Sequence, residues 1–172
     1  QRLQAEVIRD SMLAITGALS PARFGPGYRD VVIETVGAAH YYGPLDLEGS
    51  EFDRRTIYRW RHRGERHSLL EAFDCPDPSI AAPERIVTTT PTQSLSLWNH
   101  QFVLRMSREL AAQVIEDVGD DPAEQVSSVW RRVLLREATT AEQIAARELV
   151  LEFGLASLCR VLFNTSESVT LD

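Results

Sequence analysis

The fold is decided by the stretch DPAEQVSSVWRRVL, residues 121–134. It opens with Asp121-Pro122-Ala123-Glu124, which has the form of a capping box with proline at the first helical position. The apolar residues that follow recur at helical spacing: Val126, Val129, Trp130, Val133 and Leu134. The stretch therefore predicts an amphipathic helix that buries one face.

The same signals recur downstream of this helix. Thr140-Ala141-Glu142-Gln143 repeats the capping device before a helical run from Ile144 to Phe153. After Gly154, a last helix places four residues on one face: Leu155, Leu158, Cys159 and Leu162. Short connections between such helices favour antiparallel neighbours, so residues 91–172 are predicted to form a helical bundle.

Upstream, Thr90-Pro91 predicts the start of a helix that Gly119-Asp120 closes. Its apolar residues form two stripes that point in different directions, so either the helix is buried on two faces or it restarts near Asn99, a good N-cap residue. Six side chains of the bundle are expected to be mostly buried: Trp98, Phe102, Trp130, Val133, Leu158 and Leu162.

The N-terminal half is less regular. Residues 1–20 predict an N-terminal helix with Val7, Ile8 and Met12 on its apolar side and Arg9 and Asp10 on its polar side. Residues 21–90 predict an irregular region, in which 31–36 form a short strand, 57–63 form an extended segment with alternating residues, and 68–73 form a helical turn. The fold class expected is mainly α, a C-terminal helical bundle with a less regular N-terminal half containing a short extended segment.

Length and composition limit the classes of function that the chain can have. A length of 172 residues fits a single domain, and a net charge of −7 argues against binding to nucleic acid or to an anionic membrane. No stretch has the ~20 apolar residues that span a bilayer. The two cysteines, Cys75 and Cys159, neither require nor exclude a disulfide, so they leave the redox compartment open.

Several kinds of chemistry have no signature in the chain. There is no Cys-x-x-Cys-His run for haem attachment, no glycine-rich phosphate loop and no nucleophile elbow. The four histidines, His40, His62, His67 and His100, have no partner at metal-ligand spacing. We therefore expect no cofactor and no metal, and the absence of a catalytic motif disfavours catalysis by this segment alone without closing the question.

Two groups of polar residues are candidates for a site. Six arginines lie between Arg54 and Arg66, and guanidinium groups bind carboxylate, sulfate and phosphate bidentately. The alternative is that they pair with acidic side chains of the same chain. Glu71 and Asp74 are one helical turn apart, as general acid–base chemistry on a glycosidic bond would need, but such acids beside prolines are more often arginine partners or turn formers.

These considerations combine into one candidate cluster drawn from four segments. If it converges, two arginines and two acids would form a charge-assisted network. That network is either a structural clasp or a ligand site in which Arg59 or Arg85 holds an anionic group. The candidate binding residues are Tyr58, Arg59, Glu71, Asp74, Arg85 and Asn99.

The chain also resembles a known family. The resemblance is carried by the runs at 55–59, 69–79 and 85–99, by the opening residues 2–10, and by the ending around 158–164 with Glu167 and Asp172. In these runs the chain resembles a planctomycete-specific domain of unknown function. Departures are Ser168 and Thr170, where the family usually or often has aromatic residues, and a shorter span between Phe153 and Leu158.

The resemblance implies a location and neighbouring domains for the chain, but no reaction. Members form the C-terminal module of large secreted proteins that often also carry a planctomycete-type cytochrome c domain, so it implies an extracytoplasmic location and neighbouring domains as partners. It supplies no catalytic residues. Two functions stay open: a non-catalytic module that binds a partner domain or an anionic glycan, and the helical part of a hydrolase acting on anionic polysaccharide.

Overall fold

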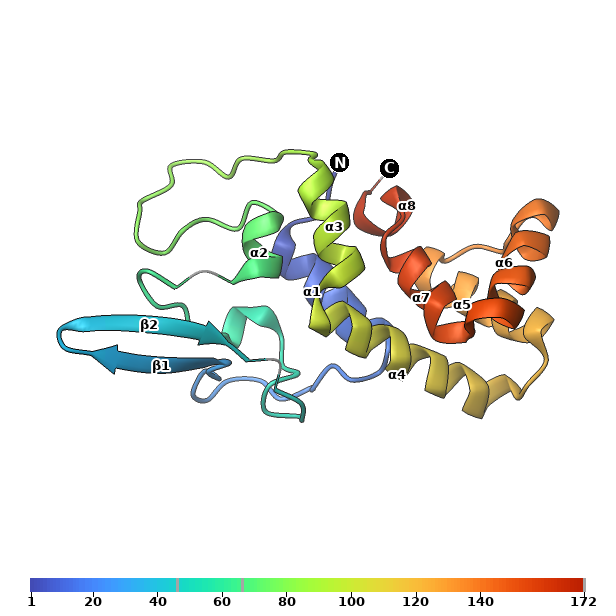
Figure 1. Cartoon of the computed structure of the whole chain (residues 1–172), viewed down its shortest axis with the longest axis horizontal. Helices are drawn as coiled ribbons and strands as arrows, with labels where there is room; N and C mark the ends of the chain where they lie inside the picture. The colour runs from blue at the N-terminus through green and yellow to red at the C-terminus, as the bar shows by residue number, and fades with distance from the viewer. Residues whose placement is uncertain (46, 66, 172) are drawn as a thin grey trace. The chain divides into compact units, whose positions relative to one another are not determined.

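The computed structural model describes residues 1–45, 47–65 and 67–171, which leaves Arg66 of the arginine cluster and Asp172 of the family resemblance outside the described residues. Helices cover 51% of the chain, and the mainly α prediction is confirmed. The chain divides into two compact units, one of residues 3–96 and one of residues 1–2 with 97–172 (Figure 1). The single-domain assignment stays a prediction.

The C-terminal unit is the expected helical bundle. It contains α4 (Gln101–Val118), α5 (Pro122–Leu134), α6 (Thr140–Phe153), α7 (Leu155–Phe163) and α8 (Ser166–Val169). Helix α7 packs against α4, α5, α6 and α8, and α5 packs against α4 and α6. The core is apolar and closely filled, with 0% exposure at Val103, Met106, Leu110, Val114, Val129 and Cys159.

Helix caps set where the helices of this unit begin. The Asp121 side chain accepts a hydrogen bond from the Ala123 N–H (3.1 Å) and starts α5. The capping box of α6 is formed by Thr139 and Glu142, so the prediction of Thr140 as its first residue was wrong by one position. Thr139 fits because its backbone is extended there, and its hydroxyl accepts from the Glu142 N–H (3.3 Å).

The helix after Pro91 does restart, and this decides between the two alternatives. Helix α3 (Pro91–Asn99) ends before α4, and the first residue of α4 follows His100, whose Nδ1 accepts from the Phe102 N–H (3.2 Å). The restart turns Leu97 inward, while Trp98 is 38% exposed. The predicted burial of Trp98 was therefore wrong, whereas Phe102, Trp130, Val133, Leu158 and Leu162 are buried.

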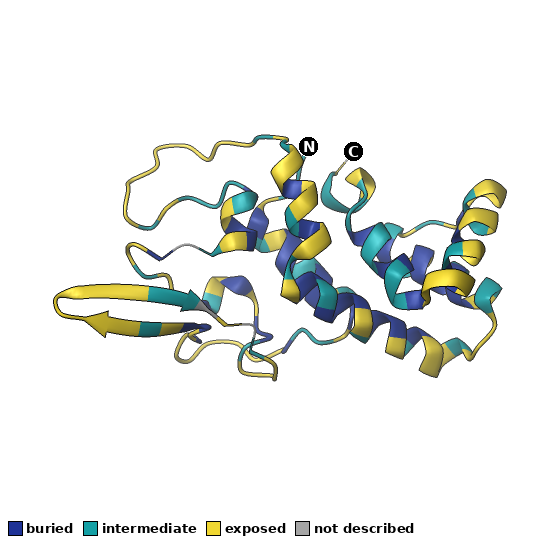
Figure 2. Ribbon diagram, viewed as in Figure 1, coloured by how far each residue is buried: buried dark blue, intermediate teal, exposed yellow. Residues whose placement is uncertain are grey.

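The N-terminal unit contains α1 (Ala5–Ile15), β1 (Val31–Val36), β2 (Ala39–Pro44), a 3-10 turn η1 (Thr56–Tyr58), α2 (Ser68–Ala72) and most of α3. Helix α1 packs on α2 and η1. Strands β1 and β2 form an antiparallel hairpin with Val31 opposite Pro44 and Val36 opposite Ala39. The tip of this hairpin is exposed (Figure 2).

Two predictions for this half need correction. The segment 57–63 is not extended from its start, because η1 includes Ile57 and Tyr58. The extended part begins at Arg59, which is bridged to Tyr28 through the backbone hydrogen bonds of Tyr28 with Tyr58 and Trp60. On α1 Ile8 and Met12 are buried as predicted, but two residues differ from the prediction. Val7 is 42% exposed, whereas Arg9 is buried because its guanidinium donates to the Phe52 and Arg54 carbonyls (both 3.0 Å).

None of the helices in the described part of the chain has the length and apolarity needed to span a bilayer.

Candidate functional site

Arg59 is the centre of a buried ionic cluster in the N-terminal unit. Its side chain is 2% exposed; its Nε donates to Asp30 Oδ2 (2.8 Å), its Nη2 lies 2.8 Å from Asp30 Oδ1, and Nη2 also pairs with Glu65. Burial by itself lowers the pKa of Arg59, but the hydrogen bonds and charges of Asp30 and Glu65 outweigh burial and raise it. The guanidinium is therefore fully charged and held by two carboxylates.

His67 connects this cluster to α2. Its Nδ1 accepts a hydrogen bond from the Leu70 N–H (3.3 Å) and caps the helix. The hydrogen-bond pattern thus assigns the ring proton to Nε2, which lies 3.8 Å from Asp30 Oδ2.

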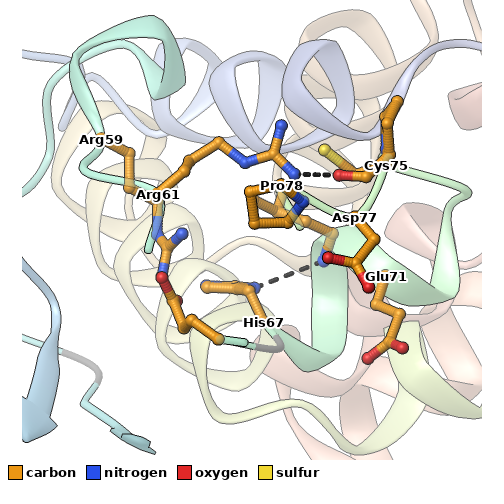
Figure 3. Close-up of a pocket in the computed structure, with 10 residues that line it drawn as sticks. Arg59, Arg61, His67, Glu71, Cys75, Asp77 and Pro78 are labelled. Carbon is orange, nitrogen blue, oxygen red and sulfur yellow. Dashed lines mark hydrogen bonds and ion pairs between the residues drawn. The ribbon is translucent and has the colours of Figure 1, made fainter. Parts of the chain in front are cut away.

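A small pocket opens beside the cluster. Its volume is about 100 Å³, which holds a few waters and is well below the roughly 300–1,000 Å³ of sites for small organic ligands. Arg61 crosses it and donates to the Pro76 carbonyl (Figure 3). The pocket is lined by Arg59, Arg61, Glu65, His67, Leu70, Glu71, Cys75, Pro76, Asp77 and Pro78.

The thiol in this pocket is not activated. Burial raises the pKa of Cys75 to about 11, and the neighbouring Glu6 carboxylate adds to the effect. The Cys75 Sγ donates to Glu6 Oε1 (3.4 Å). Since the thiolate is the nucleophilic form, Cys75 does not supply a nucleophile at neutral pH.

Of the six predicted binding residues, Arg59 and Glu71 line this pocket together. The acid and the arginine expected to join them bind elsewhere. Asp74 accepts from the Thr88 N–H (2.7 Å) and hydroxyl (2.9 Å), and Arg85 binds Glu6 through both Nη nitrogens (2.9 and 2.8 Å). Arg59 and Arg85 therefore pair with Asp30, Glu65 and Glu6, which are acids that were not predicted.

The other two predicted residues have separate places. Tyr58 accepts a hydrogen bond from the Phe24 N–H through Oη (2.9 Å), and the Arg54 guanidinium lies 4.2 Å from the centre of its ring. Asn99 ends α3 and belongs to the C-terminal unit. The assignment of the six residues to a binding site stays a prediction.

The arginine cluster divides into buried and exposed members. Arg54 and Arg59 are buried; Arg54 donates to the Phe24 (2.6 Å) and Pro26 (2.7 Å) carbonyls. Arg55, Arg61 and Arg63 are exposed, and Arg55 lies 3.9 Å from Asp10. The alternative, that these arginines pair with acidic side chains of the same chain, thus holds for Arg59. It also holds for Arg55, but its distance to the acid is longer.

Sequence reasoning missed Asp30, Glu65, Glu6 and Thr88. They lie 29, 6, 79 and 14 positions from the residues they bind, with no shared helical or strand period to signal the contact. In the described ranges 1–45, 47–65 and 67–171, no three His, Cys, Asp or Glu side chains cluster as a metal ion would require.

Comparison with known proteins identifies the family. Residues 1–150 match the profile of PSD1, described as a protein of unknown function (DUF1553). The chain belongs to this family. The PSD1 match includes the Arg59 cluster and its pocket, both of which lie before residue 150. Searches of curated proteins and of solved structures found no match.

Proposed function

We propose that this chain is a non-catalytic binding or assembly module of a larger extracytoplasmic protein. The observation that carries the proposal is the internal use of its charged groups. General acid–base catalysis needs an ionisable side chain within hydrogen-bond reach of the substrate. Here Arg59 is held by Asp30 and Glu65, while Arg85 is held by Glu6. Such pairing supports a structural role for these residues.

The proposal includes the setting that the sequence resemblance implies. The partners are then neighbouring domains of the same parent protein, with a planctomycete-type cytochrome c domain as one of them and an anionic glycan as a further partner. The resemblance, rather than the fold, supports this part of the proposal.

Phe24 is the residue best suited to contact such a partner. Its ring is 82% exposed, and its backbone has φ 63°, a left-handed conformation that costs a bulky residue roughly 1–2 kcal/mol. Arg54 holds its carbonyl and Tyr58 holds its N–H, so the strained position is fixed. An exposed, rigidly held aromatic side chain is the kind of group that anchors protein interfaces.

The experiment mixes this chain with the rest of its parent protein, expressed separately, and measures the dissociation constant by calorimetry. Phe24→Asn removes the ring but suits a positive φ, because asparagine tolerates the left-handed region. We expect the variant to melt at the same temperature as the parent chain or higher, while its association weakens about tenfold or more.

Leu135→Asn is the matched control. Leu135 also has a positive φ (55°) and is 87% exposed, so the exchange relieves similar strain at the end of α5. It should raise the melting temperature without changing the association. Unchanged binding by Phe24→Asn would refute the role of Phe24, and an absence of any association would refute the assembly proposal.

The second candidate is the helical part of a hydrolase, or a binding domain, acting on anionic polysaccharide. One observation favours it: Glu71 and Asp77 line the same pocket as Arg61, which places carboxylates beside a cation. The discriminating measurement is release of reducing ends from sulfated and uronate polysaccharides. Activity that Glu71→Gln abolishes would establish the hydrolase, whereas we expect none.

A further inference from the structure

A second hollow lies between α4 and α7 in the C-terminal unit, where these two helices pack together. Its volume is about 170 Å³, enough for several waters but too small for a whole drug-sized ligand. The lining comes from two helices of one unit: Leu104, Ser107, Arg108, Ala156, Ser157 and Arg160.

The two arginines in this hollow have donors to spare. Arg160 is held in place by Trp98, because its Nε donates to the Trp98 carbonyl (2.6 Å) and its guanidinium lies 4.2 Å from the centre of the indole ring. Its Nη nitrogens donate to no other group in the described part of the chain, and the exposed Arg108 has no carboxylate partner among those residues. Both guanidinium groups are available to a ligand.

The charge of this lining differs from that of two other hollows. The pocket beside Arg59 has three acids, Glu65, Glu71 and Asp77, and a groove of about 510 Å³ includes Asp10 beside two arginines. The α4–α7 hollow has two arginines and no acidic lining residue, in a chain whose net charge is −7. Two like charges at one hollow repel each other unless an anion lies between them.

The two serines in the lining use their hydroxyl hydrogens inside their own helices. The Ser107 hydroxyl donates to the Val103 carbonyl (2.7 Å), and the Ser157 hydroxyl donates to the Phe153 carbonyl (2.8 Å). Both hydroxyl hydrogens are thus engaged inside their own helices and are not available to a ligand. The donors left for a ligand are therefore the arginines, whose planar forks match the oxygens of sulfate and phosphate.

We propose that the α4–α7 hollow binds the sulfate or phosphate monoester group of a larger ligand through Arg108 and Arg160. The size of the hollow admits the charged group, and the remainder of the ligand extends into solvent. This site lies outside the residues used for the proposed partner contact at Phe24, so either proposal can fail without the other.

The test is an NMR titration of the 15N-labelled chain with sodium sulfate and with sodium phosphate, at ionic strength held constant by sodium chloride. We expect saturable shifts confined to amides of residues 104–108 and 156–160. Arg108→Gln should weaken binding about tenfold or more, and Arg160→Lys, which keeps the charge but loses the fork, should weaken it less. Arg108 is exposed, so its variant keeps the dispersed spectrum of a folded chain.

Arg147→Gln on α6 is the matched control, since it removes an exposed arginine of the same unit that does not line the hollow. It should leave binding within about twofold of the parent chain. Shifts that do not saturate, or equal losses in Arg108→Gln and Arg147→Gln, would mean that only net charge matters, and the site would be rejected.

Two further probes identify the source of the group. N-acetylglucosamine 6-sulfate represents a sulfated sugar, and O-phosphoserine represents a phosphorylated protein. The monoester that binds at least about tenfold more tightly than its free inorganic ion identifies the source of the group. If neither monoester binds more tightly than its ion, the proposal of an ester ligand is wrong.

Discussion

At the scale of single residues, the ion pairs of Arg59 hold three segments of the N-terminal unit together. Asp30 follows the bridge at Tyr28, Glu65 precedes α2, and Arg59 lies between them on the extended part after η1. Removing one member of a buried ion pair is costly because the other charge stays buried without compensation. In this protein Asp30 and Glu65 would both lose their cation.

Arg59→Ala should therefore reduce the free energy of unfolding by about 3–5 kcal/mol. The measurement is urea denaturation followed by far-ultraviolet circular dichroism and by tryptophan fluorescence. Arg63→Ala is the control, because Arg63 is exposed and its removal should change stability by less than about 0.5 kcal/mol. Equal stabilities of the two variants would show that the Arg59 cluster contributes nothing net.

At the scale of helices, the start of α6 depends on Arg136. The Arg136 guanidinium binds Glu142 (2.9 and 2.7 Å) and Glu167 (2.7 and 2.9 Å), and it thereby joins the capping box of α6 to α8. The hydrogen bond from Arg136, together with those from Thr139, lowers the pKa of Glu142 to about 2. A carboxyl with a lowered pKa stabilises the fold above its ordinary pKa and loses that contribution as pH falls toward the folded value.

Arg136→Gln should accordingly lower the melting temperature at pH 7, and the difference from the parent chain should shrink between about pH 4.5 and pH 2. Thermal melts across this pH range measure the effect. Arg131→Gln serves as control, because Arg131 is 3.6 Å from Glu137 on the exposed surface and does not contact the capping box. A difference that stays constant down to pH 2 would contradict the role given to Glu142.

Helices were also the features that the sequence predicted best. Asp121, Pro122 and Gly154 mark helix ends through local hydrogen bonds or backbone geometry, so a few neighbouring letters suffice to place them. The candidate site depends on contacts such as Glu6 with Arg85, which are 79 positions apart. Nothing in a single sequence specifies which acid meets which arginine, so the residue types were predicted but their partners were not.

At the scale of the whole molecule, the two units have interiors of different chemistry. Both units bury apolar side chains, but the charged residues buried in the C-terminal unit are limited to Arg105 among those described, whereas the N-terminal unit buries several: Arg9, Asp30, Asp53, Arg54, Arg59 and Glu65. Apolar packing resists local opening, while a two-stranded hairpin with an exposed tip has little to protect it. The units should therefore differ in how often their backbones open to solvent.

Hydrogen exchange measured by mass spectrometry should show this difference. We expect the slowest exchange in peptides from α4 and α7 and rapid exchange in peptides from β1 and β2. Peptides from the exposed segment 81–87 give the internal standard for unprotected amides. Protection of the hairpin equal to that of α4 would mean that the N-terminal unit is far more stable than its polar interior indicates.

The positions of the two cysteines, one half-buried and one buried, also affect how fast the protein oxidises. Cys75 and Cys159 are unpaired, and burial raises their pKa values to about 11 and about 12. Oxidation and disulfide exchange proceed through the thiolate, which at neutral pH is then roughly one part in ten thousand at Cys75 and less at Cys159. In an oxidising environment both thiols should therefore oxidise much more slowly than an exposed cysteine with an ordinary pKa.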